Sequence, residues 1–149
     1  MNKTAKNTFK KPISFFLVIV TLLGVMTLAS CKQEPLVIKD SDTCIVIRTT
    51  KEALDGNTEM LLLDYMAELK EKGEIDYSVE NGMITEINKI ENPSDFSKCW
   101  MLYTSDTENS NSAWGTVEYD GKEYGSAIVG AEMLKIKPDH LYIWVFKSF

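Results

Sequence analysis

Two short, continuous apolar runs constrain the fold of this chain more than any other feature. Residues 44–47 read CIVI and residues 141–146 read LYIWVF. Apolar runs of this length, rich in β-branched and aromatic side chains, are typical of strands that are covered on both faces. We therefore expect the two runs to lie side by side in the middle of one sheet.

The segment between the two runs contains one clear helical pattern. Asn57 or Thr58 is the expected N-cap, and Gly73 is expected to end the helix. The apolar positions follow the i, i+3, i+4, i+7 spacing of a helix that packs on a core: Leu62, Tyr65, Met66 and Leu69.

Two dipeptides favour tight hairpin turns, because both positions of each tolerate a positive φ. Asn81-Gly82 joins alternating residues 75–79 to a second run with imperfect alternation, and Asp120-Gly121 lies between two further strands. The pairs expected in the second hairpin are Tyr119 with Lys122 and Val117 with Tyr124.

These elements predict an α+β domain. We expect a β-grasp-like mixed sheet with the two apolar strands in the middle, the hairpins at its edges and one helix packed across a face. A small β-sandwich with one appended helix is the alternative. The chain has 149 residues, of which 44% are apolar, and this is enough for one domain with a core.

The first thirty residues have the layout of an export signal. Four lysines up to position 11 precede an apolar run over residues 13–29. A single transmembrane anchor is the alternative, because a run of this length can just cross a bilayer. The ending LASC at residues 28–31 resembles a bacterial lipobox, in which Cys31 is lipidated and becomes the mature N-terminus.

This layout predicts three parts of the chain and a location. Residues 1–30 are expected to form a lipoprotein signal peptide, residues 31–42 the lipidated Cys31 and a polar tether, and residues 43–149 the working domain. Two acyl chains hold a protein on a membrane without a spanning helix. The expected location is therefore the extracytoplasmic face of a bacterial membrane.

The charge is unevenly distributed along the chain. The net charge is −6, but the first thirty residues carry four lysines and no acid, so the remainder carries −10. The sequence has no cluster of Lys or Arg outside its N-terminal stretch. Such a domain repels nucleic acid, so no nucleic-acid partner is expected.

Two cysteines remain when Cys31 is set aside. A disulfide between Cys44 and Cys99 would close a loop of more than fifty residues and stabilise the domain by about 4 kcal/mol in the chain-entropy model. Two unpaired, buried thiols are the alternative, and the sequence leaves both open. Two cysteines without a neighbouring histidine do not make a metal cage, so no metal site is expected.

No motif in the sequence favours catalysis. His140 is the only histidine and falls in an expected turn, and no Gly-rich phosphate loop or serine elbow is present. The polar residues 104–111 superficially suggest a calcium loop, but Asn111 and Val117 stand where an EF-hand needs Gly and Glu. We expect a protein that is not an enzyme and carries no cofactor.

The second half of the chain is rich in aromatic residues next to Ser and Gly. Flat rings with a polar handle, beside backbone amides exposed at Gly, suit a bulky, partly apolar ligand. Tyr142 and Trp144 are expected in the core, whereas the indole of Trp114 follows a polar loop and is expected to be partly exposed. The candidate ligand contacts are Trp100, Tyr103, Trp114, Gly115, Tyr124, Gly125 and Ser126.

Three segments carry a resemblance to a known family: residues 100–103 (WMLY), residues 125–127 (GSA) and the ending at residues 134–149. Together with the expected helix, they make residues 43–149 similar to the transcobalamin-C-terminal-like domain of bacterial surface lipoproteins. In transcobalamin and intrinsic factor this domain closes over one face of cobalamin, through apolar and backbone contacts, and helps a separate helical domain to enclose the vitamin.

The resemblance implies a binding module for a corrinoid or another small amphipathic ligand. The helical partner domain is absent from this sequence, so a corrinoid would stay half exposed and bind weakly. Residues 104–111 are also inserted where related domains often have a short turn. The alternative is a protein- or glycan-interaction domain in cell-envelope assembly or adhesion, because the same rings can stack on sugars or contact a surface protein.

Overall fold

The two apolar runs are neighbouring strands, as the sequence predicts. In the computed structural model, which describes residues 34–148, β2 (Cys44–Arg48) pairs with β9 (Leu141–Lys147). Ile45 lies opposite Trp144, and Ile47 lies opposite Tyr142. The signal peptide at residues 1–30 and the lipidation of Cys31 lie outside the described residues.

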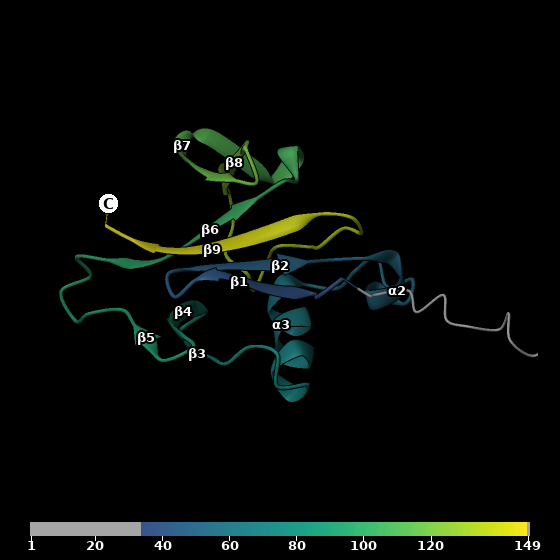
Figure 1. Ribbon diagram of the computed structural model, residues 1–149, viewed down its shortest axis with the longest axis horizontal. Helices are drawn as coiled ribbons and strands as arrows, with labels where there is room; N and C mark the ends of the chain where they lie inside the picture. Colours follow the sequence, from purple (N-terminus) through teal and green to yellow (C-terminus); the bar gives the residue numbers. More distant parts are fainter. Residues whose placement is uncertain (1–33, 149) are drawn as a thin grey trace, which may run out of the picture. The chain divides into compact units, whose positions relative to one another are not determined.

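These two strands belong to a six-stranded sheet with the order β1-β2-β9-β6-β8-β7 (Figure 1). The other strands are β1 (Val37–Ser41), β6 (Cys99–Thr104), β7 (Ser110–Tyr119) and β8 (Lys122–Ala127). Every pairing in this sheet is antiparallel, so the expected mixture of parallel and antiparallel strands is wrong. The two central strands run antiparallel because the chain re-enters the sheet at the end where it left: Arg48 at the end of β2 lies opposite Leu141 at the start of β9.

The first strand lies in the segment that was expected to be a tether. Residues 37–41 pair with β2, with Val37 opposite Ile47 and Ile38 opposite Val46. The folded unit begins at Glu34, so the boundary expected at residue 43 is too late. Lys39 and Asp40 gave this segment the composition of a loop, and charged residues of this kind are common on edge strands.

One face of the sheet is covered by α3 (Leu62–Glu71) (Figure 1). The four predicted apolar positions of this helix are fully buried, which confirms the helical pattern. The N-cap is Leu61 and makes no side-chain hydrogen bond, so the expected cap at Asn57 or Thr58 is wrong. The helix ends as expected before Gly73, which has a φ of 74°.

A second, short helix was not expected. Residues Lys51–Leu54 form α2, and the side chain of Thr50 accepts a hydrogen bond from the Ala53 N–H at 3.1 Å. One turn of helix leaves too short a periodic pattern to be read from a sequence.

The first predicted hairpin forms a small sheet of its own. It contains β3 (Tyr77–Glu80), β4 (Met83–Ile87) and β5 (Ile90–Glu91) and packs through Ile84 and Ile87 into the core beside α3. The turn at Asn81-Gly82 is confirmed, with positive φ at both residues. The imperfect alternation has a simple cause, because a second turn at residues 88–89 interrupts the run.

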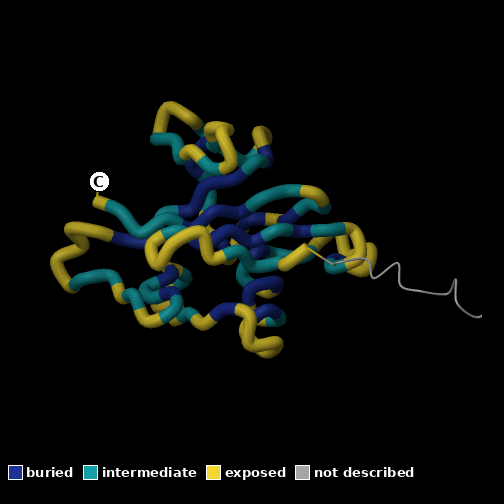
Figure 2. The backbone as a smooth tube through the Cα atoms, in the orientation of Figure 1, coloured by how far each residue is buried: buried dark blue, intermediate teal, exposed yellow. Residues whose placement is uncertain are grey.

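The β7–β8 hairpin forms one edge of the large sheet, and its side chains pack over the face of the sheet opposite α3 (Figure 1). The predicted register around Asp120-Gly121 is confirmed, including the pairs of Tyr119 with Lys122 and Val117 with Tyr124. Side chains of this hairpin pack against a small buried cluster of Val46, Tyr103 and Ile143. The central strands are therefore buried on both faces, as Figure 2 shows in dark blue.

Candidate functional site

An open pocket of about 300 Å³ lies on the α3 side of the large sheet. Its walls come from the turn between β3 and β4, from β6 and β9, and from residues 126–131, which comprise the end of β8 and the segment after it. The pocket thus lies where the small sheet meets the large one. Its volume is at the lower end of the range of small-molecule sites.

Three buried side chains of the pocket lining come from two strands of the large sheet. Trp100 and Leu102 come from β6, and Trp144 comes from β9, where it lies directly opposite Leu102. Alternation along a strand places these three side chains on the same face of the sheet. Trp100 and Trp144 are only 5% and 4% exposed.

The two indoles differ in their hydrogen bonding. The Nε1–H of Trp100 donates to the carbonyl oxygen of Ile90 at 2.8 Å. Among the described residues, the Nε1 of Trp144 is the one buried side-chain nitrogen or oxygen without a partner. Leaving a buried donor without a partner typically costs about 1–3 kcal/mol, and native proteins do so rarely.

The pocket lining is uncharged and has both apolar and polar surface. None of the residues that line it carries a formal charge, and the exposed side chains of Met83 and Ile128 lie at its edge. The Glu132 carboxylate lies beside Gly82, so close that a Cβ on this glycine would overlap it. A flexible, polarizable methionine at the edge suits apolar ligands of varied shape.

Two of the predicted contact residues lie at this pocket. Trp100 contributes its buried ring, which also lies 5.4 Å from the ring of Phe146 between centroids. Ser126 is buried and belongs to the segment that forms one wall.

Four other predicted contacts lie on the opposite face or at its edge, so the structure does not join them to the pocket. Tyr103 is 1% exposed in the cluster under the β7–β8 hairpin, and Tyr124 packs against that cluster. A Cβ on Gly115 would lie 3.8 Å from the Tyr103 hydroxyl, and a Cβ on Gly125 would lie 3.1 Å from the Ser112 nitrogen. The expectation of one shared site failed because neighbouring residues of a strand point to opposite faces.

Trp114 stands apart from both groups. Its side chain is 62% exposed, which agrees with the expected partial exposure. It lies where the register between β7 and β8 is interrupted, between Asn111 and Thr116. Gly115 follows with a φ of 119°, a conformation that only glycine adopts with ease.

Both remaining cysteines are free thiols. Cys44 lies on β2 and Cys99 on β6, and β9 runs between these strands. Two strand spacings are roughly 10 Å, which exceeds the distance that a disulfide can bridge. Burial raises the pKa of both thiols, and the nearby Asp40 adds to this effect at Cys44.

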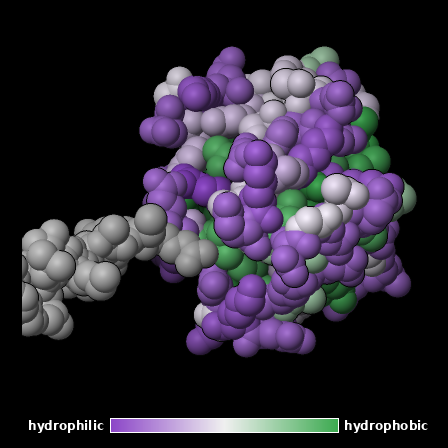
Figure 3. All heavy atoms as spheres, turned by 90° about the vertical axis from the view of Figure 1, so that its right-hand side faces the viewer, coloured by the Kyte–Doolittle hydropathy of each residue, from purple (hydrophilic) through white to green (hydrophobic). Residues whose placement is uncertain are grey.

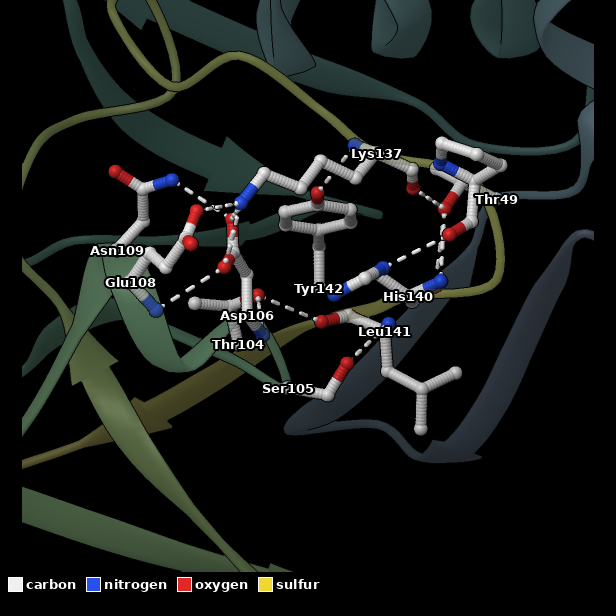
Figure 4. A network of polar contacts seen from close by, with 11 residues as sticks. Thr49, Thr104, Ser105, Asp106, Glu108, Asn109, Lys137, His140, Leu141 and Tyr142 are labelled. Carbon is white, nitrogen blue, oxygen red and sulfur yellow. Dashed lines mark hydrogen bonds and ion pairs between the residues drawn. The ribbon is translucent and has the colours of Figure 1, made fainter.

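The polar segment at residues 104–111 contains two buried side chains, Thr104 and Asp106. Asp106 is 2% exposed and lies 3.0 Å from the Lys137 ammonium (Figure 4). Its carboxylate also accepts hydrogen bonds from the Asn109 amide at 2.7 Å and from the Glu108 N–H at 3.1 Å. Burial alone raises the pKa of Asp106, but these hydrogen bonds and the lysine outweigh it, and the net pKa is lowered.

This network holds the loop that leads into β9. Thr104 donates to the Leu141 carbonyl, Ser105 accepts from the Leu141 N–H, and Tyr142 accepts from the Lys137 N–H (Figure 4). Lys137 therefore occupies the place beside Asp106 and Glu108 that a cation would take. In the described part of the chain, no group of three His, Cys, Asp or Glu residues is arranged to hold a metal ion.

A second hollow of about 400 Å³ lies beside α2, lined by residues 56–58, Lys51, Leu54 and Pro138. On the side of the molecule that Figure 3 shows, hydrophilic residues cover most of the surface and hydrophobic ones show in the gaps between them.

Within residues 34–148, no helix has the length and apolar character needed to span a bilayer.

Several pocket residues were missed in the sequence. Trp144 was expected only as a core residue, and residues 128–131 were not considered. The signal that was available is the short apolar stretch AIVGA at residues 127–131, which ends the second hairpin without a turn motif. Its position over β6 depends on contacts between distant parts of the chain.

The comparisons with known proteins give no assignment. No family model matches the chain, and no curated protein or solved structure matches it either.

Proposed function

We propose that this chain is a non-enzymatic, lipid-anchored binding module for a small amphipathic molecule on the extracytoplasmic face of a bacterial membrane. The observation that carries the proposal is the open pocket at Trp100 and Trp144, which has an uncharged lining of apolar side chains together with polar surface. Concave, mostly apolar sites with few polar groups are typical of ligand binding.

The ligand class follows from this chemistry and from the family resemblance. A corrinoid is the candidate that the resemblance suggests, and the pocket volume of about 300 Å³ suits one edge of such a molecule. The rest of the ring system would stay outside, so we expect weak binding by this module alone. We propose in addition that the domain is β-grasp-like and related to the transcobalamin-C-terminal-like domains.

Calorimetric titration with cobalamin and cobinamide tests the corrinoid assignment. A fragment of residues 32–149 contains both core clusters of the described residues, including the strands that line the pocket. We expect saturable binding with a Kd in the high micromolar to millimolar range, near −4 to −6 kcal/mol. The absence of a response at millimolar ligand contradicts the corrinoid assignment.

A matched pair of variants locates the binding. Gly130 lines the pocket, has no positive φ, and a Cβ there meets nothing within 4 Å, so Gly130→Leu adds a side chain at the pocket without backbone strain. We expect this variant to weaken binding at least tenfold. Trp114→Phe changes an indole outside the pocket lining and should leave the affinity unchanged.

The exposed Trp114 supports a second candidate function, a protein- or glycan-interaction domain. An isolated, exposed indole on an interrupted strand can stack on a sugar ring or enter a partner protein. If Trp114→Ala abolishes binding to envelope material while Gly130→Leu does not, this second function replaces the first.

The membrane anchor has its own test. Mass spectrometry of the protein purified from bacterial membranes should show a mature chain that starts at a diacylated Cys31. An unprocessed chain without acyl groups contradicts the anchor.

A further inference from the structure

The chain enters the folded domain at one end of the large sheet. Val37, the first residue of β1, lies opposite Ile47 near the end of β2, and the Leu36 carbonyl accepts a hydrogen bond from the Arg48 N–H at 2.7 Å. The carboxylate of Glu34 forms an ion pair with the Arg48 side chain. The chain is therefore held against the domain from residue 34 onward.

Helix α2 and the loop before β9 lie at this same end of the sheet. The helix begins three residues after Arg48. Thr49 holds the loop, because its N–H donates to the His140 carbonyl at 3.1 Å and its carbonyl accepts from the Asp139 N–H at 2.9 Å. Figure 3 views the molecule from the side on which Figure 1 places α2. We call this surface the α2 end; it comprises residues 34–36, 49–58 and 138–140.

The link between the α2 end and the proposed lipid anchor is short. Only residues 31–33 precede Glu34 in a chain that starts at Cys31, and three extended residues span at most about 11 Å. The seven residues of β9 alone extend over about 20 Å. The anchored domain therefore cannot turn its far end, where Cys99 lies opposite Lys147, toward the bilayer.

The α2 end offers apolar surface to a lipid layer. The hollow of about 400 Å³ beside α2 is lined in part by Leu54 and Pro138, and Lys51 is the one charged residue in the lining. Lys51 is exposed and forms no ion pair within residues 34–148. A lysine in this position can lay its apolar stem on apolar surface and keep its ammonium among polar headgroups.

The charges at the α2 end favour a zwitterionic headgroup. Besides Lys51, three exposed acids lie there, Glu52, Asp55 and Asp139. The lysine can pair with the phosphate of a phosphatidylethanolamine headgroup, and an acid can pair with its ammonium group. Residues 31–149 carry a net charge of −10, which repels an anionic membrane. The contact therefore depends on the anchor rather than on net attraction.

We infer that the α2 end lies against the membrane that holds Cys31, with Lys51 and the hollow beside α2 in the headgroup layer of a zwitterionic phospholipid bilayer. This inference rests on the proposed lipid anchor and adds an orientation to it. The far end of the large sheet then points away from the membrane.

Paramagnetic broadening of amide signals tests this orientation. The mature, acylated protein is placed in nanodiscs of phosphatidylethanolamine and phosphatidylcholine that contain a trace of lipid with a gadolinium chelate on its headgroup. The broadening falls steeply with distance from the headgroups. We expect the amide of Thr58, at the α2 end, to be broadened at least about fivefold more than that of Lys98, which lies next to Cys99 at the far end.

Two matched charge reversals test the contact itself. Lys51→Glu replaces the ammonium in the headgroup layer by a carboxylate, so we expect the broadening at Thr58 to fall at least about twofold. Lys98 is also exposed and also forms no ion pair within the described residues. Lys98→Glu should therefore leave the broadening at Thr58 unchanged.

The outcomes separate the anchor from the orientation. If mass spectrometry shows an acylated Cys31 but Thr58 and Lys98 are broadened equally, or if the two charge reversals have the same effect, the inference is overturned while the anchor stands. If Cys31 carries no acyl group, both the anchor and the inference are overturned.

Discussion

Trp100 and Trp144 occupy neighbouring strands on the same face of the large sheet and are almost equally buried, yet only Trp100 has a hydrogen-bond partner. Its Nε1–H donates to the Ile90 carbonyl at 2.8 Å, whereas that of Trp144 donates to no group in the described part of the chain. Both rings are thus buried, but the indole N–H has a hydrogen-bond acceptor only at Trp100. The pair therefore offers an internal comparison of a satisfied and an unsatisfied donor.

The same substitution at both positions should have different costs. Trp100→Phe removes a hydrogen bond and leaves the Ile90 carbonyl without its partner, so we expect it to destabilise the domain by about 1–2 kcal/mol more than Trp144→Phe does. Both variants lose a similar volume of ring, so the cavity contribution nearly cancels. Urea unfolding of the two variants measures this difference. Equal losses would show that the Trp144 donor has a partner.

Asp106 should stabilise the domain in a way that depends on pH. Its pKa is lowered in the folded protein, so the stabilisation is complete above the unfolded pKa near 4 and is lost as the pH falls toward the folded pKa. We expect Asp106→Asn to cost about 1–3 kcal/mol at pH 7 and clearly less at pH 2–3. Thermal unfolding across this pH range checks the trend.

Glu108 provides the control for Asp106, because its carboxylate pairs with the same lysine while its side chain is largely exposed. Glu108→Gln should cost less than about 0.5 kcal/mol at any pH, as is usual for exposed ion pairs. If Asp106→Asn shows the same cost at pH 3 as at pH 7, the ionised carboxylate is not the source of the stabilisation.

Two tyrosines should resist ionisation until the domain unfolds. Burial raises the pKa of Tyr65 and of Tyr142 to about 12, with Glu74 and Glu68 adding to the effect at Tyr65. Because the folded pKa is raised, the stability contributed by these groups is present below pH 10 and is lost as the pH rises from 10 toward 12. Absorbance at 295 nm, followed together with circular dichroism, should show part of the phenol signal titrating only with unfolding. Complete ionisation near pH 10 in a folded domain contradicts this prediction.

Two glycines should respond in opposite ways to alanine. Gly121 has a φ of 69° in the β7–β8 turn, so Gly121→Ala should cost about 1 kcal/mol in backbone strain, although nothing lies within 4 Å of the new Cβ. Gly130 has equal space and no positive φ, so Gly130→Ala should leave the stability unchanged or raise it by up to about 1 kcal/mol. The free energies of unfolding of both variants decide this, and a stabilising Gly121→Ala contradicts the turn geometry.

The parts of the fold that could be predicted are those encoded by local patterns. The apolar runs, the helical stripe on α3 and the two hairpin turns each depend on a few neighbouring residues, and all are confirmed. β1 was missed because an edge strand carries charged residues like a loop. The separate small sheet was missed because the partner of a hairpin is chosen by contacts between distant residues.

The candidate site could be predicted only in part for the same reason. Sequence reasoning found Trp100 but grouped it with Tyr103 and Tyr124, which lie on the other face of the sheet. Ser126 also belongs to the pocket lining, although it lies directly opposite Tyr103. Trp144 lies in an apolar run, and nothing local distinguishes an indole with a partner from one without. The pocket exists because residues 126–131 and the β3–β4 turn meet over β6, although they are far apart in the chain.

The ¹⁵N–¹H spectrum of the indole groups tests the central claim most directly. The chain has three tryptophans, so three indole signals can be assigned with single Trp→Phe variants. When the fragment of residues 32–149 is titrated with cobinamide, we predict that the Trp100 and Trp144 signals move in a saturable way, because both residues line the pocket, and that the Trp114 signal stays in place. A titration that leaves the Trp100 and Trp144 signals unmoved, or that moves the Trp114 signal instead, contradicts the account.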